Sequence, residues 1–140
     1  MRIQKILLPV DDSEHSALAC RYAVEISIKT GAAVIILHCH EEVELRLMED
    51  GAKEVLDPII DESNKILASY ADMMKKAGVN CSCRSVKGSP GDQIPWVARQ
   101  EKSDLVIMGS KGRSNLAGIV IGSVTHKVLE QSPCPILVVR

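Results

Sequence analysis

Short apolar runs alternate along the chain with longer segments whose apolar residues recur every three or four positions. The short runs predict strands, and they occupy Ile3–Val10, Ala32–His40, Asn80–Lys87, Asp104–Met108 and Pro135–Val139. The longer segments predict helices, which we place at Ser13–Thr30, from Val55 or Asp57 to Ala77, from Ser89 onwards, and at Ser123–Gln131. Strands that alternate with helices predict an α/β fold, in which helices cover both faces of a parallel sheet.

Helix-start and helix-stop residues refine these boundaries. Asp12, Ser13 and Glu14 can cap the first helix, with Asp12 the expected cap, and Gly31 can end that helix in a left-handed conformation. Ser89 is the expected cap of the third helix, which Pro90 would begin. Pro95 removes a backbone donor, so this helix should be kinked or begin later.

Two helices carry a predicted buried stripe. The first helix would bury Ala17, Cys20, Val24 and Ile28, and the second Leu56, Ile59, Ile60, Leu67, Tyr70, Ala71 and Met74. The Asn80–Lys87 strand is more polar than the others, which is typical of a sheet edge. The acidic stretch from Glu41 to Glu54 is either a solvated connection or, less favoured, a partner-binding face.

Composition narrows the function classes. The 140 residues suit a single domain spanning 1–140, and 46% of them are apolar while only 2% are aromatic. A net charge of −1 gives no basic field for nucleic acid or anionic lipid. No apolar run approaches the roughly 20 residues of a membrane helix, and no signal peptide is apparent, so we expect a cytoplasmic protein.

A glycine-bearing segment between the fourth strand and the last helix predicts a phosphate site. Gly109 and Gly112 are followed, after nine residues, by Gly122 and Ser123. Glycine permits close backbone approach, and a helix start such as Val124 offers free N–H groups and a positive dipole end. Neither a G-x-x-x-x-G-K-S/T nor a G-x-G-x-x-G motif is present.

Cysteine and histidine residues offer weaker signals. The five cysteines lack zinc-site spacing, and their odd number argues against a disulfide framework. Cys81 and Cys83 would share one face of a strand, where we expect two small buried side chains rather than a redox or metal pair. His38 and His40 would share a face as structural residues, with Cys39 opposite as a possible cofactor wall. His126 is expected on the surface of the last helix.

The G-x2-G-x9-G-S/T pattern resembles the nucleotide-binding signature of universal stress proteins of the ATP-binding type. The opening Pro9-Val10-Asp11 and the tail Ser132-Pro133-Cys134-Pro135 are similar to the same family. The resemblance covers essentially the whole chain. It implies a three-layer sandwich with a five-stranded parallel sheet of order 3-2-1-4-5, the adenine nucleotide alpha hydrolase-like arrangement, and ATP as ligand, accompanied by Mg²⁺ that phosphates and water would hold.

The resemblance also implies a set of site residues. Pro9, Val10 and Asp11 would border the ribose and adenine, with Cys39 at the adenine edge. Met108 and Gly109 would border the nucleoside. The phosphates would be held by Gly112, Gly122, Ser123 and Val124. Lys111 and Arg113 are candidates to screen phosphate charge.

These residues leave three functional hypotheses. The favoured one is an ATP-binding regulatory module that acts in stress response through partner proteins, with slow or no hydrolysis, because no carboxylate–histidine pair is aimed at the phosphate loop. The alternatives are a slow ATPase or adenylyl-transferring enzyme, and a nucleotide-free dimeric scaffold. The fifth strand, an apolar edge in the implied order, predicts a homodimer.

Overall fold

Strands and helices alternate along the chain, as the sequence pattern predicts. The computed structural model describes residues 1–40, 52–111 and 121–140, with only the backbone described for 52–57. The elements are β1 (Lys5–Pro9), α1 (Glu14–Thr30), β2 (Ala33–His40), α2 (Ala52–Lys76), β3 (Cys81–Lys87), α3 (Pro90–Gln100), β4 (Leu105–Gly109), α4 (Ser123–Gln131) and β5 (Ile136–Val139). The acidic stretch 41–51 and the side chain of Leu56 lie outside the described residues.

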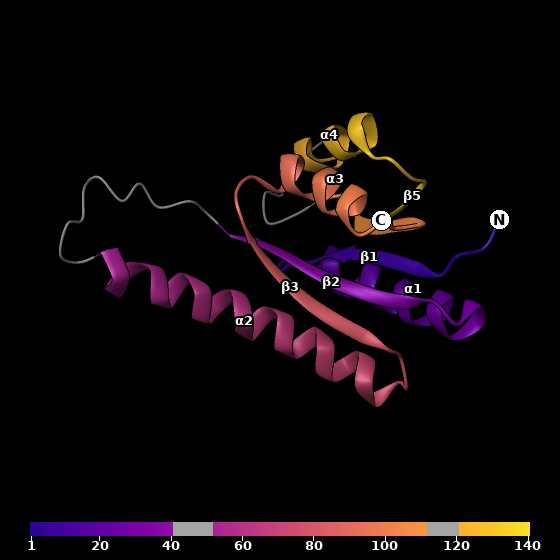
Figure 1. Cartoon of the computed structure of the whole chain (residues 1–140), viewed down its shortest axis with the longest axis horizontal. Helices are drawn as coiled ribbons and strands as arrows, with labels where there is room; N and C mark the ends of the chain where they lie inside the picture. Colours follow the sequence, from indigo (N-terminus) through magenta and orange to yellow (C-terminus); the bar gives the residue numbers. More distant parts are fainter. Residues whose placement is uncertain (41–51, 112–120) are drawn as a thin grey trace.

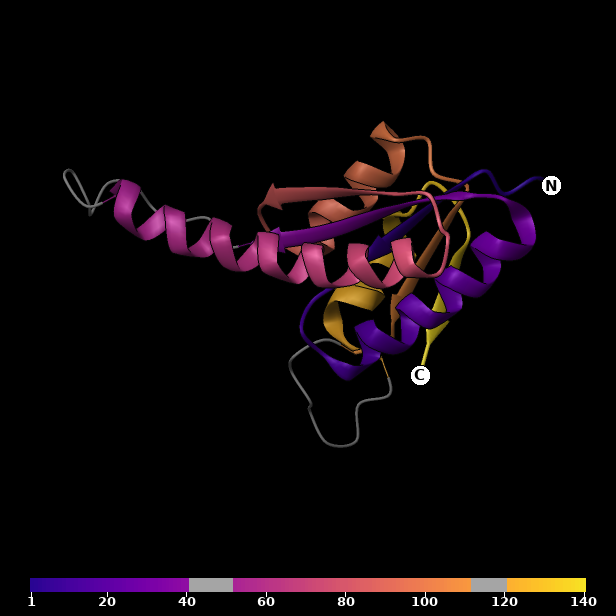
Figure 2. The same cartoon turned by 90° about the horizontal axis from the view of Figure 1, so that it is seen from below.

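The strands form one parallel sheet in the order β3-β2-β1-β4-β5. This is the implied order, and it confirms that the polar strand β3 and the apolar strand β5 are the two edges. Helices α1 and α2 cover one face, and α3 and α4 cover the other (Figures 1 and 2). The result is the expected three-layer sandwich.

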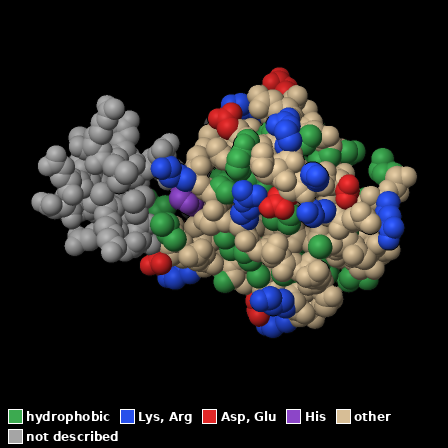
Figure 3. Space-filling model, in the orientation of Figure 1, with side chains coloured by type: hydrophobic (Ala, Val, Ile, Leu, Met, Phe, Trp, Pro, Cys, Tyr) green, Lys and Arg blue, Asp and Glu red, His purple; other side chains and the backbone are tan. Residues whose placement is uncertain are grey.

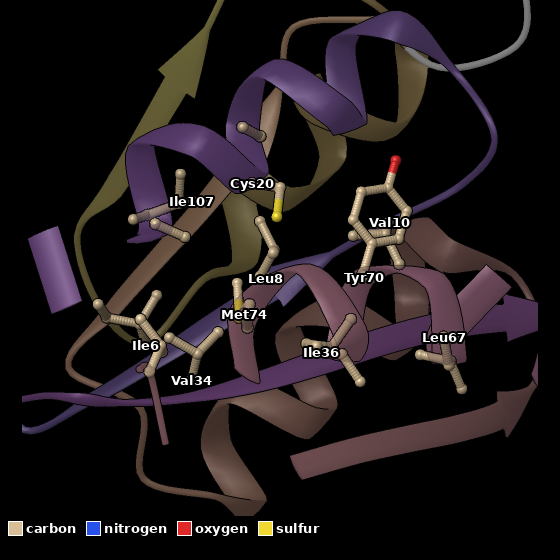
Figure 4. Packing of buried hydrophobic residues seen from close by; sticks show 14 of the residues in the cluster. Ile6, Leu8, Val10, Cys20, Val34, Ile36, Leu67, Tyr70, Met74 and Ile107 are labelled. Carbon is tan, nitrogen blue, oxygen red and sulfur yellow. The ribbon is translucent and has the colours of Figure 1, made fainter. Parts of the chain in front are cut away.

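Both faces of the sheet are buried, because successive strand residues point to opposite sides. In β1, Ile6 and Leu8 pack with α1 and α2, whereas Leu7 packs with α3 and α4. All three side chains are fully buried. Figure 4 shows the first of these cores, in which Cys20 of α1 and Met74 of α2 meet the sheet. Aliphatic side chains therefore supply most of the core, as the shortage of aromatic residues requires.

Two residues of the predicted helix stripes are exposed. Ile28 of α1 is 62% exposed because Ser27 takes the buried position, where its hydroxyl donates to the carbonyl of Ala32 at 2.6 Å. Ile60 of α2 is 40% exposed, whereas its neighbour Ile59 faces the end of β2. In the rest of the predicted α2 stripe, Leu67, Tyr70, Ala71 and Met74 are buried as predicted, and Ile59 is half-buried.

The helix ends correct two details of the prediction. Ser13, not Asp12, is the N-cap of α1, and its hydroxyl accepts a hydrogen bond from the backbone N–H of Ser16 at 3.2 Å. Gly31 ends α1 with a φ of +75°, as predicted. Helix α3 begins at Pro90 and contains Pro95, so it does not start later. Ser89 is the N-cap of α3, but its side chain makes no capping hydrogen bond.

The two β3 cysteines are less buried than expected. Cys81 is half-buried and Cys83 is exposed. Both thiols lie against α2, where Cys81 donates to the carbonyl of Ala71 at 3.9 Å and Cys83 to that of Leu67 at 3.8 Å. An edge strand has no neighbour beyond it to cover its outer side chains, so the prediction of two buried residues is wrong for Cys83.

Charged and aromatic side chains cover the β3 edge. Arg84 pairs with Glu101 at 2.8 Å and lies over the ring of Trp96, 5.5 Å from its centroid. A charged residue held across an edge strand discourages pairing with another chain.

Figure 3 shows Lys and Arg interspersed with Asp and Glu on the face in view, without a field of one sign. None of the helices in the described ranges has the length and apolar character needed to span a bilayer.

The end of β4 lies against the start of α1. A Cβ atom at Gly109 would stand 2.6 Å from the Cβ of His15 and 3.0 Å from its carbonyl carbon. These contacts are shorter than packed atoms tolerate, and backbone atoms cannot turn aside as a side chain can. Gly109 is therefore required for packing whether or not it contacts a ligand.

Replacing Gly109 with alanine should accordingly destabilise the fold. We expect Gly109→Ala to lower the free energy of unfolding by about 1–3 kcal/mol, because the added methyl group forces β4 and α1 apart. Urea denaturation followed by circular dichroism measures this change. A variant with wild-type stability would show that the two elements separate at no cost.

The cysteines should react in the order of their exposure. Burial raises the pKa of the Cys20 thiol to about 11, with a smaller contribution from Cys81, and the residue has no exposed surface. We expect iodoacetamide to modify Cys83 first and Cys20 last in the native protein at pH 8, because the reagent reaches the exposed Cys83 thiol directly and the fully buried Cys20 thiol only when the fold opens. Peptide mass spectrometry over time gives the order, and early loss of Cys20 would contradict it.

Candidate functional site

A pocket opens at the carboxyl ends of β1, β2 and β4. The space in it that a water-sized sphere can occupy is about 110 Å³, and the space reaches about 550 Å³ when the open mouth is counted. The lining residues come from these three strand ends and from the N-terminal parts of α1, α3 and α4: Pro9, Val10, Asp11, Ser16, Leu37, His38, Cys39, Pro90, Ile94, Met108, Gly109, Lys111, Val124 and Thr125. Strand ends of a parallel sheet are where ligands of such folds bind.

The pocket brings together most of the site residues predicted from sequence. Eight of them line it: Pro9, Val10, Asp11, Cys39, Met108, Gly109, Lys111 and Val124. Gly122 and Ser123 precede Val124 at the start of α4 without lining the pocket. Gly112 and Arg113 lie outside the described residues.

Asp11 organises the connection from β1 to α1. Its Oδ1 atom accepts hydrogen bonds from the backbone N–H of Ser13 at 2.8 Å and from the hydroxyl of Ser16 at 2.9 Å. The Ser16 Oγ atom in turn accepts from the backbone N–H of Asp11 at 2.9 Å. This reciprocal pairing engages one carboxylate oxygen within the loop and holds Asp11 at the pocket wall.

Tyr70 ties α2 to the same loop. Its hydroxyl donates to the carbonyl of Asp11 at 3.2 Å, and its ring is buried in the core. Burial raises the pKa of Tyr70 to about 12, and the charges of Cys20, Asp11 and Asp12 add to the shift. The phenol therefore stays protonated at neutral pH and keeps its donor directed at the loop.

One side of the pocket is apolar. Leu37, Ile94 and Met108 belong to the core cluster under α3 and α4, and Cys39 packs against that cluster. Burial raises the pKa of the Cys39 thiol to about 12, so the side chain is neutral and behaves as a small apolar group. This side can receive a flat apolar group such as a nucleobase.

The start of α4 supplies the opposite character. Its N-cap, Gly122, has no side chain to accept from the first-turn N–H groups, and the first turn contains no acidic residue. Helix α1 by contrast has the Ser13 cap and Glu14, and α3 has Asp92 in its first turn. Among the residues that the structure describes, no side chain of the N-cap or first turn of α4 therefore caps its N–H groups or offsets its positive dipole end. Lys111 adds a cation to the pocket wall.

Hydrogen bonds close the base of the segment between β4 and α4. The backbone N–H of Gly122 donates to the carbonyl of Ser110 at 2.7 Å. The Ser110 N–H donates to the carbonyl of Val139 at 2.8 Å. The hydroxyl of Thr125 reaches the carbonyls of Gly109 at 3.0 Å and Ser110 at 3.2 Å. Residues 110 and 122 are thus adjacent whatever course the chain takes between them.

His38 makes a structural contact on the other face of β2 from Cys39. Its Nδ1 atom lies 2.7 Å from the Ser63 hydroxyl, which lies 2.7 Å from that of Ser85. Within the described part of the chain, no group of three or more His, Cys, Asp or Glu residues is arranged to hold a metal ion. His126 is on the surface beside Glu130, as predicted, with 71% of its side chain exposed.

Sequence reasoning missed six of the lining residues, which are Ser16, Leu37, His38, Pro90, Ile94 and Thr125. Ser16 and Thr125 are helix residues whose hydroxyl groups face the pocket loops, and Pro90 and Ile94 arrive from a helix that follows the edge strand. Nothing in their local sequence distinguishes them from ordinary helix residues. Their positions one turn after Ser13 and directly after Val124 are the signal that could have marked the two hydroxyl residues.

Comparison with known proteins shows which family has this sequence pattern and fold. The model of the universal stress protein family matches residues 2–140. A universal stress protein of Thermus aquaticus is 32% identical over 136 residues, covering 96% of this chain and 97% of the relative.

Solved structures agree. The structure of MJ0577, from Methanocaldococcus jannaschii, has a TM-score of 0.90 and 31% identity, covering 99% of this chain and 96% of its own. A universal stress protein in complex with cAMP has a TM-score of 0.81 and 27% identity, covering 100% and 99% of the two chains. The chain belongs to the universal stress protein family.

Proposed function

We propose that this protein is an ATP-binding universal stress protein, in which residues 1–140 form one nucleotide-dependent regulatory domain that acts in stress response through partner proteins. The observation that carries the proposal is the uncapped start of α4 at the pocket wall. Its Gly122 cap and acid-free first turn leave a donor-rich, positive end beside Val124 and Lys111. Such an end favours phosphate oxygens.

The apolar side of the pocket suits the nucleoside. Pro9, Cys39 and Met108 can enclose the base, while Asp11 has a second carboxylate oxygen that can accept from a ribose hydroxyl. The relative that was crystallised with cAMP supports an adenine nucleotide as ligand. Lys111 would screen the phosphate charge, and the predicted roles of Gly112 and Arg113 remain part of the proposal.

Magnesium would accompany ATP without a protein cage. Mg²⁺ is commonly held through substrate phosphates and water, with few carboxylate ligands, and the described residues offer no cluster of three metal ligands. The Asp11 carboxylate is engaged with Ser13 and Ser16 in positioning the loop. We therefore propose that ATP acts mainly as a conformational ligand, with slow hydrolysis at most.

Gly122 provides the sharpest test of the binding site. A Cβ atom there would lie 3.4 Å from the Ser110 carbonyl oxygen, which the fold tolerates. We expect Gly122→Val to weaken ATP binding by about 2 kcal/mol, roughly thirtyfold, because the branched side chain crowds the phosphates. Isothermal titration of ATP in the presence of Mg²⁺ measures the loss.

Cys81→Ser is the matched control, because Cys81 is on β3 away from the pocket. It should leave ATP affinity unchanged. Equal losses in the two variants would mean that the site has been misplaced. No heat from the wild-type protein at millimolar ATP would reject nucleotide binding itself and favour the scaffold hypothesis.

The free edge at β5 supports a homodimer. Ile136, Leu137 and Val138 are only half-buried, and the strand pairs with β4 alone. Its four residues carry neither charge nor proline to discourage pairing with a second copy. We expect sedimentation velocity at micromolar concentration to show a dimer, and Leu137→Lys to shift it towards monomer. A wild-type monomer under these conditions would refute strand-five pairing.

A further inference from the structure

Thr125 makes an unusual contact for a helical threonine. It is the third residue of α4 and is only 2% exposed. A threonine further along a helix commonly bonds the carbonyl one turn back, but no residue of α4 lies one turn before Thr125. Here the hydroxyl lies 3.0 Å from the carbonyl oxygen of Gly109 and 3.2 Å from that of Ser110, which are 16 and 15 residues earlier in the chain.

These contacts join the two halves of the pocket. Gly109 ends β4 on the nucleoside side, next to Met108. Thr125 follows Val124 in the first turn of α4, on the phosphate side. The hydroxyl has one hydrogen, which it can share between the two carbonyl oxygens. The spacing between strand end and helix start is therefore set by a side chain as well as by the backbone.

The backbone contact alone leaves this spacing less defined. Gly122 donates to the Ser110 carbonyl at 2.7 Å, and one such hydrogen bond by itself acts as a hinge between the two segments. Thr125 adds a second point of attachment three residues further into the helix. Two attachments fix the direction of the α4 N-terminus, and preorganised donors bind an anion with less ordering cost.

We propose that Thr125 is a positioning residue for the nucleotide phosphates, whose hydroxyl holds the start of α4 at the spacing from β4 that a base-bound nucleotide requires. The inference rests on the proposed function and deepens it. Thr125 touches no phosphate in this account; it acts through the N–H groups of Ser123 and Val124. Its removal should therefore weaken phosphate binding while leaving nucleoside binding in place.

The test compares Thr125→Val with the wild-type chain for ATP and for adenosine. Valine keeps the volume and removes the donor. We expect ATP affinity to fall about tenfold, the loss of roughly one hydrogen bond's contribution, while adenosine affinity stays within about twofold. Titration calorimetry measures ATP, and competition against ATP measures adenosine. A purely structural role would weaken both ligands equally.

Two further variants complete the design. Thr125→Ser keeps the hydroxyl and loses only the methyl group, so its ratio of ATP to adenosine affinity should match the wild type even if it is less stable. This comparison decides the matter if the valine variant does not fold. Thr30→Val is the matched control, since the Thr30 hydroxyl makes the common local bond to the Ile26 carbonyl at 2.7 Å and is exposed. It should change neither affinity.

The outcomes separate the two proposals. Unchanged ATP affinity in Thr125→Val, parallel loss of ATP and adenosine, or a lowered affinity ratio in Thr125→Ser would each overturn the positioning role while the nucleotide site stands. If the wild-type protein binds neither ATP nor adenosine, the proposed function is overturned, and the role of Thr125 with it.

Discussion

The divergence of the chain after β1 and β4 is the constraint on which the candidate site depends. These two strands are neighbours in the middle of the sheet, yet β1 leads to α1 on one face and β4 leads to α4 on the other. Their connections cannot cover the carboxyl edge between them, so a crevice remains there. The pocket is therefore a consequence of strand order, and side chains only determine what it can hold.

The wall of that crevice is stiffened mainly through backbone carbonyls. Tyr70 from α2 bonds the carbonyl of Asp11, and Thr125 from α4 bonds those of Gly109 and Ser110. Each hydroxyl belongs to a helix on a different face of the sheet. The helices that bury the two hydrophobic cores thus also hold the loops at the strand ends. The stability of the helix layers is therefore coupled to the shape of the pocket.

Polarity is divided across the pocket in a way that matches a nucleotide. Leu37, Cys39, Ile94 and Met108 make one side apolar, and burial keeps the Cys39 thiol neutral. Lys111 and the uncapped α4 start make the other side positive. A ligand with a flat base at one end and an anionic tail at the other is favoured by both sides at once, and neither side alone would select it.

The sequence by itself determined the alternation of elements, the burial of both sheet faces and the glycine-bearing segment before α4, because periodicity and turn residues act locally. Resemblance to the universal stress protein family, which covers the whole chain, also implied that Pro9, Asp11, Cys39 and Met108 are pocket residues. Only the tertiary structure decided which hydroxyl groups form hydrogen bonds between separate elements of the fold. Ser27 replaces Ile28 in the core because Ala32 needs a donor, and Thr125 faces β4 because α4 packs there. Such contacts join residues that only packing brings together, so they cannot be predicted from local sequence.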